Sequence, residues 1–497
     1  MKTHTIKRLF ALMLAGLMLL TAFACGKSTE ESTSAVTTTA TTVDIAQGTT
    51  APSEGTETTV TTTEATTQYL DDLPEDLRYD GKTVTFLYRE EIKSEFWAEN
   101  YTGEVANDAI YKSISAVEER FGVNIEALFL KGHTTDVRTS YMDHIDNQIL
   151  GGDCTYDWVD LMIGNAPVRM IQGNYINLLN LENLDLSKPW YIPNMEETVA
   201  VLDRLFFVSG DSSLGYLKCA FCIYYNKDLG EKYGVENLNE VVKSGKWTIE
   251  KVRQLATQTS TDLNGDGVLA IEDQLGFVNH DNNHRCGFVG STNMQFFTPQ
   301  EDGSHKFTFG TGRDHSVCTA ISDLYYSTPG ALLPNSSNAS QSLLPLYNQI
   351  SDYFRSDRIF MITAEMGDVV DCDFHSMSST YSVLPYPKYD EEQENYYTTS
   401  RNTHNAFLMP NTCKDPEMAA AVLDALSAVK YQNALPAFYE VVLKTKYSAD
   451  SETAETLQVC QGNIKEQYSM PIMLDREKNM AILPNAITVI KLTREIR

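Results

Sequence analysis

The amino-acid sequence predicts an α/β protein preceded by a long leader. In its folded part, short apolar runs of strand type alternate with amphipathic stretches of helical period, the pattern of layered α/β folds. The composition changes at about Tyr69, from a stretch without aromatic residues to one rich in Tyr and Phe. Roughly 430 residues follow that point, enough for two or three lobes.

The first part of the folded region alternates strand and helix. Ile110, Ile114 and Val117 recur at helical spacing, and Gly151 with Gly152 ends the next helical stretch. The expected elements are strands at 83–88, 122–130 and 158–163 and helices at 106–121 and 138–150.

The later part continues the alternation. Thr248 is expected to cap a helix after Trp247, and Pro416 stands in the first turn of another helix that runs to Ala428. The expected strands are at 205–208, 217–225, 275–277 and 360–363, with an extended run at 382–387.

The N-terminus has the features of a secretory signal. Basic residues precede an almost unbroken apolar run at 9–20, which is too short for a membrane span. Small residues then lead to Cys25, as in a bacterial lipobox, although Ala22 stands where Leu is more usual. We expect residues 1–24 to be a lipoprotein signal peptide and Cys25 to be lipidated, typically with palmitate. Ordinary cleavage that leaves Cys25 unmodified is the alternative.

Residues 25–70 are predicted to be a disordered tether. They are mostly Thr, Ser, Ala, Glu and Gly, which cannot bury enough apolar surface to offset the entropy of ordering. As a flexible coil, this stretch spans roughly 35–40 Å on average. It would hold the folded part away from the membrane.

Charge and cysteine usage exclude some functions. A formal net charge of −28 at pH 7 argues against nucleic acid and anionic lipid as partners. Cys219 and Cys222 are expected on opposite faces of a strand, so they favour neither a mutual disulfide nor a zinc knuckle. Eight cysteines follow Cys25, namely Cys154, Cys219, Cys222, Cys286, Cys318, Cys372, Cys413 and Cys460. We expect most of them to be buried free thiols, and any disulfide connectivity stays open.

Residues 262–273 have the spacing of a calcium loop. Carboxylate or amide groups stand at loop positions one, three and five, and Gly267 occupies the sixth position, where the chain turns sharply. The expected ligands of a structural Ca²⁺ are Asp262, Asn264, Asp266, the carbonyl of Val268, and Asp273. Asp273 replaces the more usual Glu, and Ala270 leaves one ligand to water. A turn rich in Asp and Gly without an ion is the alternative.

In the order of its motifs, the chain resembles extracellular solute-binding lipoproteins of carbohydrate ABC transporters, the maltose-binding-protein-like family 1. The resemblance covers about residues 79–460, and the tail from Gly462 departs from the pattern. Besides the lipobox and tether, it is carried by residues 107–111, 118–123, 156–160, 224–229, 245–248, 273–277 and 384–387 and by the helix after Asp415.

The resemblance implies a two-lobed periplasmic-binding-protein-like fold of type II, with a ligand cleft between lobes joined by hinge crossings. Lobe one would comprise 71–210 and 400–430, and lobe two 211–399 and 431–497. Crossings are expected near Gly210 and Asp211 and at 399–401. Ligands of such proteins lie at loops that follow strand ends. The expected ligand-binding residues are Arg89, Trp97, Asn165, Asp211, Asn279, Glu365 and Arg401.

The implied function is a non-enzymatic receptor that captures a carbohydrate, expected to be an oligosaccharide, and delivers it to an ABC permease. It would sit on the extracytoplasmic face of the cell membrane of a Gram-positive bacterium, held by its lipid anchor alone. A secreted glycan-active enzyme and a cell-surface adhesive module remain alternatives. Ser212 with Asp281 and His284 resembles an SGNH esterase set, but these residues lie at the wrong places along the chain.

Overall fold

The computed structural model describes residues 70–170, 172–193, 195–200, 202–334 and 344–443, and the strand pair at 472–473 and 481–482. The compact unit that contains the described residues is Thr67–Arg497. Its first residue is close to the predicted start of the folded part. The predicted signal peptide, Cys25, all but the last residue of the tether and Cys460 lie outside the described residues.

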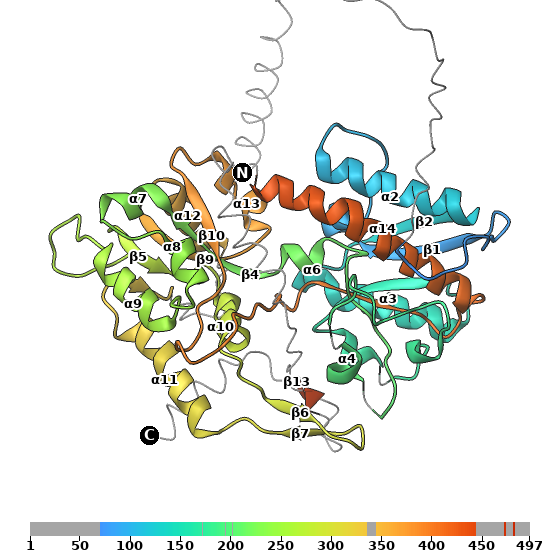
Figure 1. The fold of residues 1–497 in the computed structure, drawn as a ribbon. Coiled ribbons are helices and arrows are strands. Elements are labelled where there is room, and N and C mark those ends of the chain that lie inside the picture. The colour runs from blue at the N-terminus through green and yellow to red at the C-terminus, as the bar shows by residue number, and fades with distance from the viewer. Residues whose placement is uncertain are drawn as a thin grey trace, which may run out of the picture. The chain divides into compact units, whose positions relative to one another are not determined.

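The first lobe is built on a four-stranded sheet in the order β11-β3-β1-β2. Figure 1 labels β1 and β2 of this sheet. β1 pairs parallel with β2 and β3, whereas β11 pairs antiparallel with β3. The central strands β1 and β3 are buried along almost their whole length, because helices cover the sheet. The strands are β1 (Thr83–Arg89), β2 (Asn124–Leu130), β3 (Trp158–Met162) and β11 (Asn405–Leu408).

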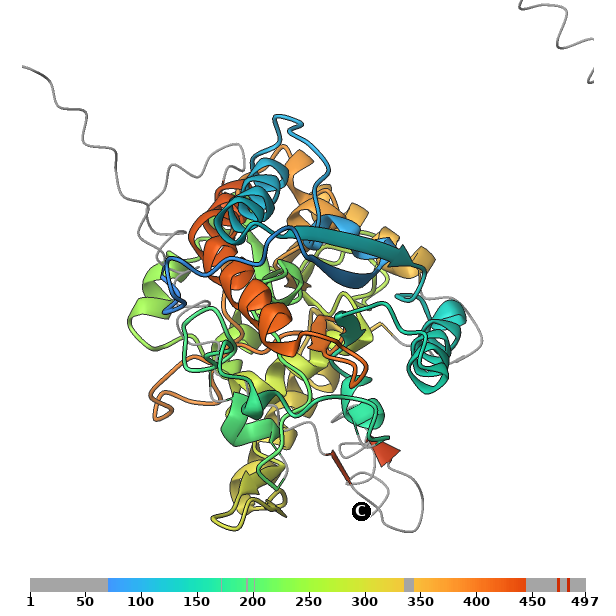
Figure 2. The same cartoon turned by 90° about the vertical axis from the view of Figure 1, so that its right-hand side faces the viewer.

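Three long helices belong to this lobe: α2 (Val105–Phe121), α3 (Thr135–Gly151) and α14 (Pro416–Leu443). α2 begins where the side chain of Glu104 accepts hydrogen bonds from two backbone N–H groups, and it ends at Gly122 with φ 60°. α14 packs along α2, as Figures 1 and 2 both show.

The second lobe is built on a five-stranded sheet in the order β10-β4-β9-β5-β8. β5 pairs parallel with β8 and β9, and β4 runs antiparallel to both β9 and β10. Its strands are β4 (Phe221–Asn226), β5 (Leu275–Val278), β8 (Ala331–Leu332), β9 (Ile359–Glu365) and β10 (Tyr381–Leu384).

Local sequence explains the start of α9 in this lobe. The hydroxyl of Thr248 accepts from the backbone N–H of Lys251, as predicted for a helix cap. Trp247 is fully buried and its indole N–H donates to the carbonyl of Pro385 at 2.7 Å. The longer helices of the lobe are α9 (Ile249–Gln258), α11 (Gly312–Tyr326) and α12 (Leu344–Arg355), and the shorter ones are α7 (Lys227–Lys232), α8 (Leu238–Lys243), α10 (Cys286–Ser291) and α13 (Asp368–Asp371).

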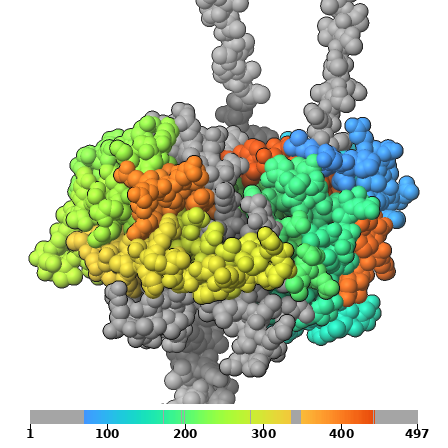
Figure 3. Space-filling view, turned by 60° about the horizontal axis from the view of Figure 1, so that its bottom comes forward, coloured from blue at the N-terminus to red at the C-terminus, as the bar shows by residue number. Residues whose placement is uncertain are grey.

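A hairpin of the second lobe reaches the first lobe. Its strands are β6 (Phe297–Pro299) and β7 (His305–Phe307). The carbonyl of Gly303 in its turn accepts from the N–H of Leu202 at 3.4 Å. In Figure 3 the yellow surface of this region lies beside the green surface of the first lobe.

The remaining short elements are η1 (Glu90–Glu95), α4 (Ala166–Met170), η2 (Leu178–Asn180), α5 (Met195–Val199), α6 (Gly215–Lys218), η3 (Asn282–Arg285), η4 (Phe374–Ser376), β12 (Ile472–Met473) and β13 (Ala481–Ile482). None of the helices in the described part of the chain has both the length and the apolarity of a membrane span.

The two crossings between the lobes run side by side. Ala220 forms an antiparallel bridge with Ser400, and the N–H of Arg401 donates to the carbonyl of Cys219 at 2.8 Å. The second crossing therefore lies where the sequence predicts it. The first crossing lies later than expected, because Gly210 still bridges to Tyr191 in the first lobe.

The expected element boundaries need three corrections. The expected strand at 205–208 contributes only the bridge of Val208 to Phe407, because Leu205 hydrogen-bonds to Asn177 and Leu178 instead. The expected strand at 217–225 begins at Phe221, since the residues before Cys219 form α6. The helix expected to end at Ala428 continues to Leu443, so a change of lobe after residue 430 would fall inside α14.

Candidate functional site

The topology of the second sheet brings Glu365 and Arg401 together. Glu365 ends β9, where it pairs in register with Phe221 at the start of the antiparallel strand β4. Because β4 begins just after the first crossing, the second crossing lies next to Glu365. The guanidinium Nη1 of Arg401 donates to the Glu365 carboxylate at 2.8 Å. Both residues were predicted to bind ligand from their positions alone.

Two residues of the loop after β5 join this pair. Asp281 lies 3.6 Å from Nη2 of Arg401, and Nε2 of His284 lies 3.3 Å from the Glu365 carboxylate. Burial opposes a charge on His284, but the hydrogen bond and charge of Glu365 raise the pKa of His284 above its ordinary value. Burial acts against the ionised form of Asp281 too, yet Arg401 and His284 lower its pKa. The four groups form a mutually stabilised charged set.

A second charged group lies beside the first crossing. The ammonium of Lys218 is 3.5 Å from the carboxylates of both Glu95, in the first lobe, and Asp371, in the second. Cys219, the next residue along the chain, is within electrostatic reach of Glu95, Glu365 and Arg401. We call the combined set the junction cluster: Glu95, Lys218, Asp281, His284, Glu365, Asp371 and Arg401.

The side chains of the junction cluster are buried enough for their hydrogen bonds to be stronger than in water, and exposed enough to contact a ligand. The side chains of Arg401 and Lys218 are 24% and 19% exposed, and that of Glu365 is 12% exposed. Hydrogen bonds to charged groups contribute about 1.5–3 kcal/mol each. The arrangement can therefore hold a hydroxyl-rich neutral ligand between carboxylate acceptors and guanidinium and ammonium donors.

Two of the predicted ligand residues are engaged inside the protein. Arg89 is 1% exposed and forms a two-pronged ion pair with Asp160 at 2.7 and 3.1 Å. The side chain of Asn279 accepts from the hydroxyl of Tyr325 at 2.8 Å and donates to the carbonyl of Asp281 at 2.5 Å. Arg89 ends β1 and Asn279 follows β5, but their polar atoms are used to position other chain segments.

The other predicted ligand residues remain partly accessible in the first lobe. Trp97 packs against the core with its ring partly exposed, two residues after Glu95 of the junction cluster. Asn165 lies half-buried in the turn after β3, where its N–H donates to the carbonyl of Met162. Asp211 is half-buried beside Trp190, and burial raises the pKa of its carboxyl group to about 8.

The predicted calcium loop joins α9 to β5, as expected. Its carboxylates accept backbone hydrogen bonds within the loop: Asp262 from Gly265 and Gly267, and Asp273 from Leu263 and Ala270. The N–H donors of Ala270 and Leu263 lower the pKa of Asp273. Within the described residues, the loop's three aspartates are not gathered within coordination range of one another. The loop is preformed as a turn and would have to close around an ion.

The thiols in the described part of the chain are all free, as predicted: Cys154, Cys219, Cys222, Cys286, Cys318, Cys372 and Cys413. Only Cys222, Cys318 and Cys372 are buried, so the expectation that most of them are buried is wrong for the described thiols.

Sequence reasoning missed Glu95, Lys218 and Asp371 because it searched only the loops directly after strands. Lys218 precedes β4, whose antiparallel direction places its beginning at the edge where β9 ends. Glu95 and Asp371 lie farther along the chain, at the ends of the short helices η1 and α13 that follow β1 and β9. The signal that could have found them is a charged residue just before an antiparallel strand or at the end of a short helix that follows one.

Comparison with solved structures confirms the two-lobed fold. The galacto-N-biose/lacto-N-biose I-binding protein of the ABC transporter from Bifidobacterium longum, solved with lacto-N-biose, superposes with a TM-score of 0.51 at 11% identity. The match covers 78% of this chain and 87% of that chain. No protein-family model matches the sequence, and no curated protein does.

Two further structures align less closely. An extracellular solute-binding protein of family 1 from Alicyclobacillus acidocaldarius has 12% identity and a TM-score of 0.47, over 80% of this chain and 90% of that chain. An ABC substrate-binding protein from Listeria monocytogenes, in complex with cycloalternan, has 14% identity and a TM-score of 0.47, over 76% and 87%. All three are described as binding proteins.

Proposed function

We propose that this chain is an extracytoplasmic receptor that captures an oligosaccharide at the junction cluster and delivers it to the permease of an ABC transporter. The observation that carries the proposal is the pairing of Arg401 with Glu365 and Asp281, and of Glu365 with His284, where the two lobes join. The two-lobed fold supports it, because ligands of such folds lie between lobes that close by hinge motion.

The chemistry of the cluster favours binding over catalysis. Glycoside hydrolysis needs one carboxylic acid that protonates the leaving group and a second carboxylate that acts as base or nucleophile. Glu365 is held by Arg401 and His284, and Asp281 faces the same guanidinium. Carboxylates paired with cations are good acceptors for sugar hydroxyls. Against the effect of burial, Arg401 and His284 lower the pKa of Asp281, which makes it a poor proton donor.

The proposal includes attachment to the membrane through a lipid on Cys25. The lipobox pattern and the Thr-rich tether of the sequence support this arrangement. The tether gives the receptor a range of tens of ångströms, so it can meet a permease in the same membrane without leaving the surface. An inhibitor of the lipoprotein signal peptidase should leave the signal peptide uncleaved, and Cys25→Ser should prevent attachment of the lipid.

We also propose that the loop 262–273 binds a structural Ca²⁺. It joins α9 to β5, and Gly265 and Gly267 give it the positive φ angles of 77° and 81° that a tight loop of this type needs. Closing the loop on an ion would tie the end of α9 to the start of β5. The site would stabilise the second lobe without touching the sugar.

The test is a thermal-shift screen of the folded chain against a panel of neutral oligosaccharides, followed by mass spectrometry of the recovered ligand. The receptor proposal predicts that at least one oligosaccharide raises the melting temperature and is recovered unchanged. Recovery of shortened or transferred products would instead support the glycan-active enzyme. Binding only to insoluble or cell-wall glycans would support an adhesive module.

A further inference from the structure

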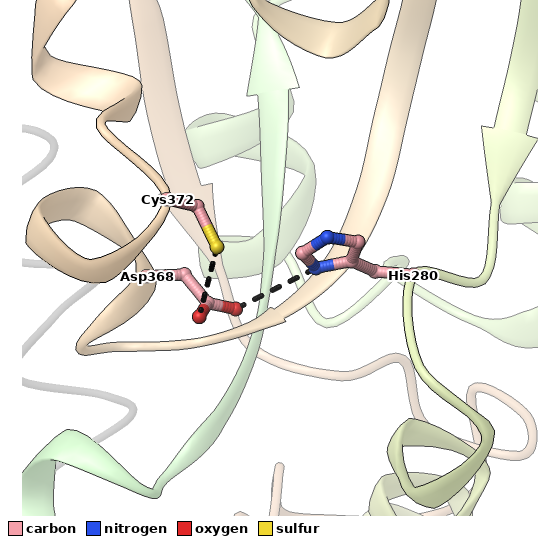
Figure 4. A group of neighbouring side chains, drawn as sticks. All are labelled: His280, Asp368 and Cys372. Carbon is pink, nitrogen blue, oxygen red and sulfur yellow. Dashed lines mark hydrogen bonds and ion pairs between the residues drawn. The ribbon is translucent and has the colours of Figure 1, made fainter. Parts of the chain in front are cut away.

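Three side chains of the second lobe converge on one buried point that the junction cluster does not use. They are His280, after β5, and Asp368 and Cys372, on α13 and at its end (Figure 4). One ligand atom from each lies within 4.8 Å of the other two, and all three residues are buried. A nitrogen, an oxygen and a sulfur are thus presented together in a space closed to bulk water.

The ring of His280 is fixed so that its free nitrogen faces the other two groups. Nε2 lies 2.8 Å from the hydroxyl oxygen of Ser351, and that hydroxyl donates to the carbonyl of Tyr347. The Ser351 oxygen therefore serves as acceptor and Nε2 carries the proton. Nδ1 is buried, makes no hydrogen bond among the described residues, and lies 3.8 Å from the carboxylate of Asp368.

The carboxylate and thiol are held in place by neighbouring groups. The hydroxyl of Tyr347 lies 3.1 Å from Asp368 and 3.0 Å from the sulfur of Cys372, and its ring stacks on His280. The other carboxylate oxygen accepts from the N–H of Glu365 at 2.9 Å. Such supporting hydrogen bonds are what orients the ligands of metal sites.

The gap between these groups has the size of a metal ion. A nitrogen lone pair and a carboxylate that face each other across 3.8 Å are too far apart for a hydrogen bond. An ion between them could lie about 2.0–2.2 Å from the nitrogen and from the oxygen, and the bond from zinc to a thiolate sulfur is about 2.3 Å long. The thiol sulfur lies 3.4 Å from the carboxylate, so closing the site needs side-chain shifts of less than roughly 1 Å.

We propose that His280, Asp368 and Cys372 bind one divalent ion of the zinc class. The mixed nitrogen, oxygen and sulfur set matches zinc, whereas calcium requires oxygen ligands alone. On binding, the thiol proton leaves to solvent and the sulfur forms a bond to the metal, so each ion releases one proton from Cys372.

The ion would fix the chain segments that carry two residues of the junction cluster, Asp281 and Glu365. Asp368 holds the backbone of Glu365, and His280 directly precedes Asp281. A metal would thus join the loop after β5 to α13 and fix the two carboxylates that Arg401 contacts. This role is independent of which ligand the junction cluster takes.

The test uses cobalt(II) as a spectroscopic probe on the whole folded chain, made without a polyhistidine tag and stripped with a chelator. A thiolate ligand gives an intense sulfur-to-cobalt absorption band in the near ultraviolet, which oxygen ligands of the loop 262–273 cannot give. We expect the band to saturate at one cobalt per chain and zinc to displace it. Absence of the band from the wild-type protein would overturn the proposal.

Two variants locate the site. Cys372→Ser should abolish the band and weaken zinc binding at least about tenfold, since even loss of a supporting group costs metal sites 10–100-fold. Cys318→Ser, which removes another buried free thiol of the same lobe, should leave both unchanged. Loss of the band in Cys318→Ser, or its persistence in Cys372→Ser, would contradict the assignment. Circular dichroism of each variant confirms that it is folded.

Discussion

The ion pair between Arg89 and Asp160 should be a determinant of the stability of the first lobe and not of ligand binding. Both side chains are essentially buried, at 1% and 0% exposure. Arg89 also donates to the carbonyl of Thr403 at 3.1 Å, and Asp160 accepts from Asn405 at 3.0 Å. The pair therefore ties β1 to β3 and to the segment that leads into β11.

The size of the effect follows from burial. Removing one partner leaves an uncompensated buried charge, which costs about 3–5 kcal/mol. Arg89→Met and Asp160→Asn should each lower the free energy of unfolding of the first lobe by that amount. The double variant leaves neither charge unpaired. The double variant should therefore lose less free energy of unfolding than the two single variants lose together. The difference should be about 1–3 kcal/mol, the coupling typical of residues in one network.

Urea unfolding followed by tryptophan fluorescence measures these losses, because Trp97, Trp158 and Trp190 all lie in the first lobe. Lys82→Met is the matched control, since the Lys82–Asp415 pair is 57% and 36% exposed and should contribute less than about 1 kcal/mol. If Arg89→Met unfolds like the wild type but loses sugar binding, Arg89 is a ligand residue after all.

Three further predictions concern calcium, pH and closure. Asp262→Ala combined with Asp266→Ala should remove a Ca²⁺-dependent rise in melting temperature, worth about 1.4 kcal/mol at ten times the dissociation constant; identical melting of the wild type with Ca²⁺ and with EGTA would exclude the ion. Burial lowers the pKa of Lys430 in the folded chain to about 7, whereas an exposed lysine in the unfolded chain has a pKa of about 10.4. Between these two pH values the unfolded chain therefore binds one more proton than the folded chain. Unfolding free energy should therefore rise with pH in this window, by at most about 1.4 kcal/mol per unit; Lys430→Met should remove that part of the slope in urea titrations, and an unchanged slope would refute the assignment. Saturating sugar should reduce the radius of gyration in small-angle scattering if the lobes close at the paired crossings, and equal dimensions with and without sugar would argue against hinge closure.

Sequence patterns predicted the elements whose local signals are strong. β1, α2, β2, α3 and β3 follow one another as expected, because period-two and helical spacing are clear there and glycines mark the helix ends. The end of α14 was not predictable in this way. Its C-terminal part contains buried apolar residues and includes Pro436 inside the helix, where tertiary packing overrides the local preference.

The candidate site was predicted in part, for a geometric reason. Glu365 and Arg401 were found because each stands at an end of a strand or crossing. Arg89 stands at such an end as well, but the acidic partner that draws it inward, Asp160, lies on a neighbouring strand that only the fold brings close. Lys218 was missed because strand direction within a mixed sheet cannot be read from a single strand. Pairing across the sheet decides which strand-end residues come together in the junction cluster.

The most direct test of the central claim is calorimetric titration of the oligosaccharide found by screening into the wild-type protein and into Arg401→Gln and Glu365→Gln. The account predicts binding to the wild type and a tenfold to hundredfold loss in each variant, the loss expected from one charge-assisted hydrogen bond. Lys251→Gln, which removes an ion pair with Glu236 far along the second lobe, should bind as the wild type does. Unchanged affinity in both folded junction variants would place the sugar elsewhere and contradict the account.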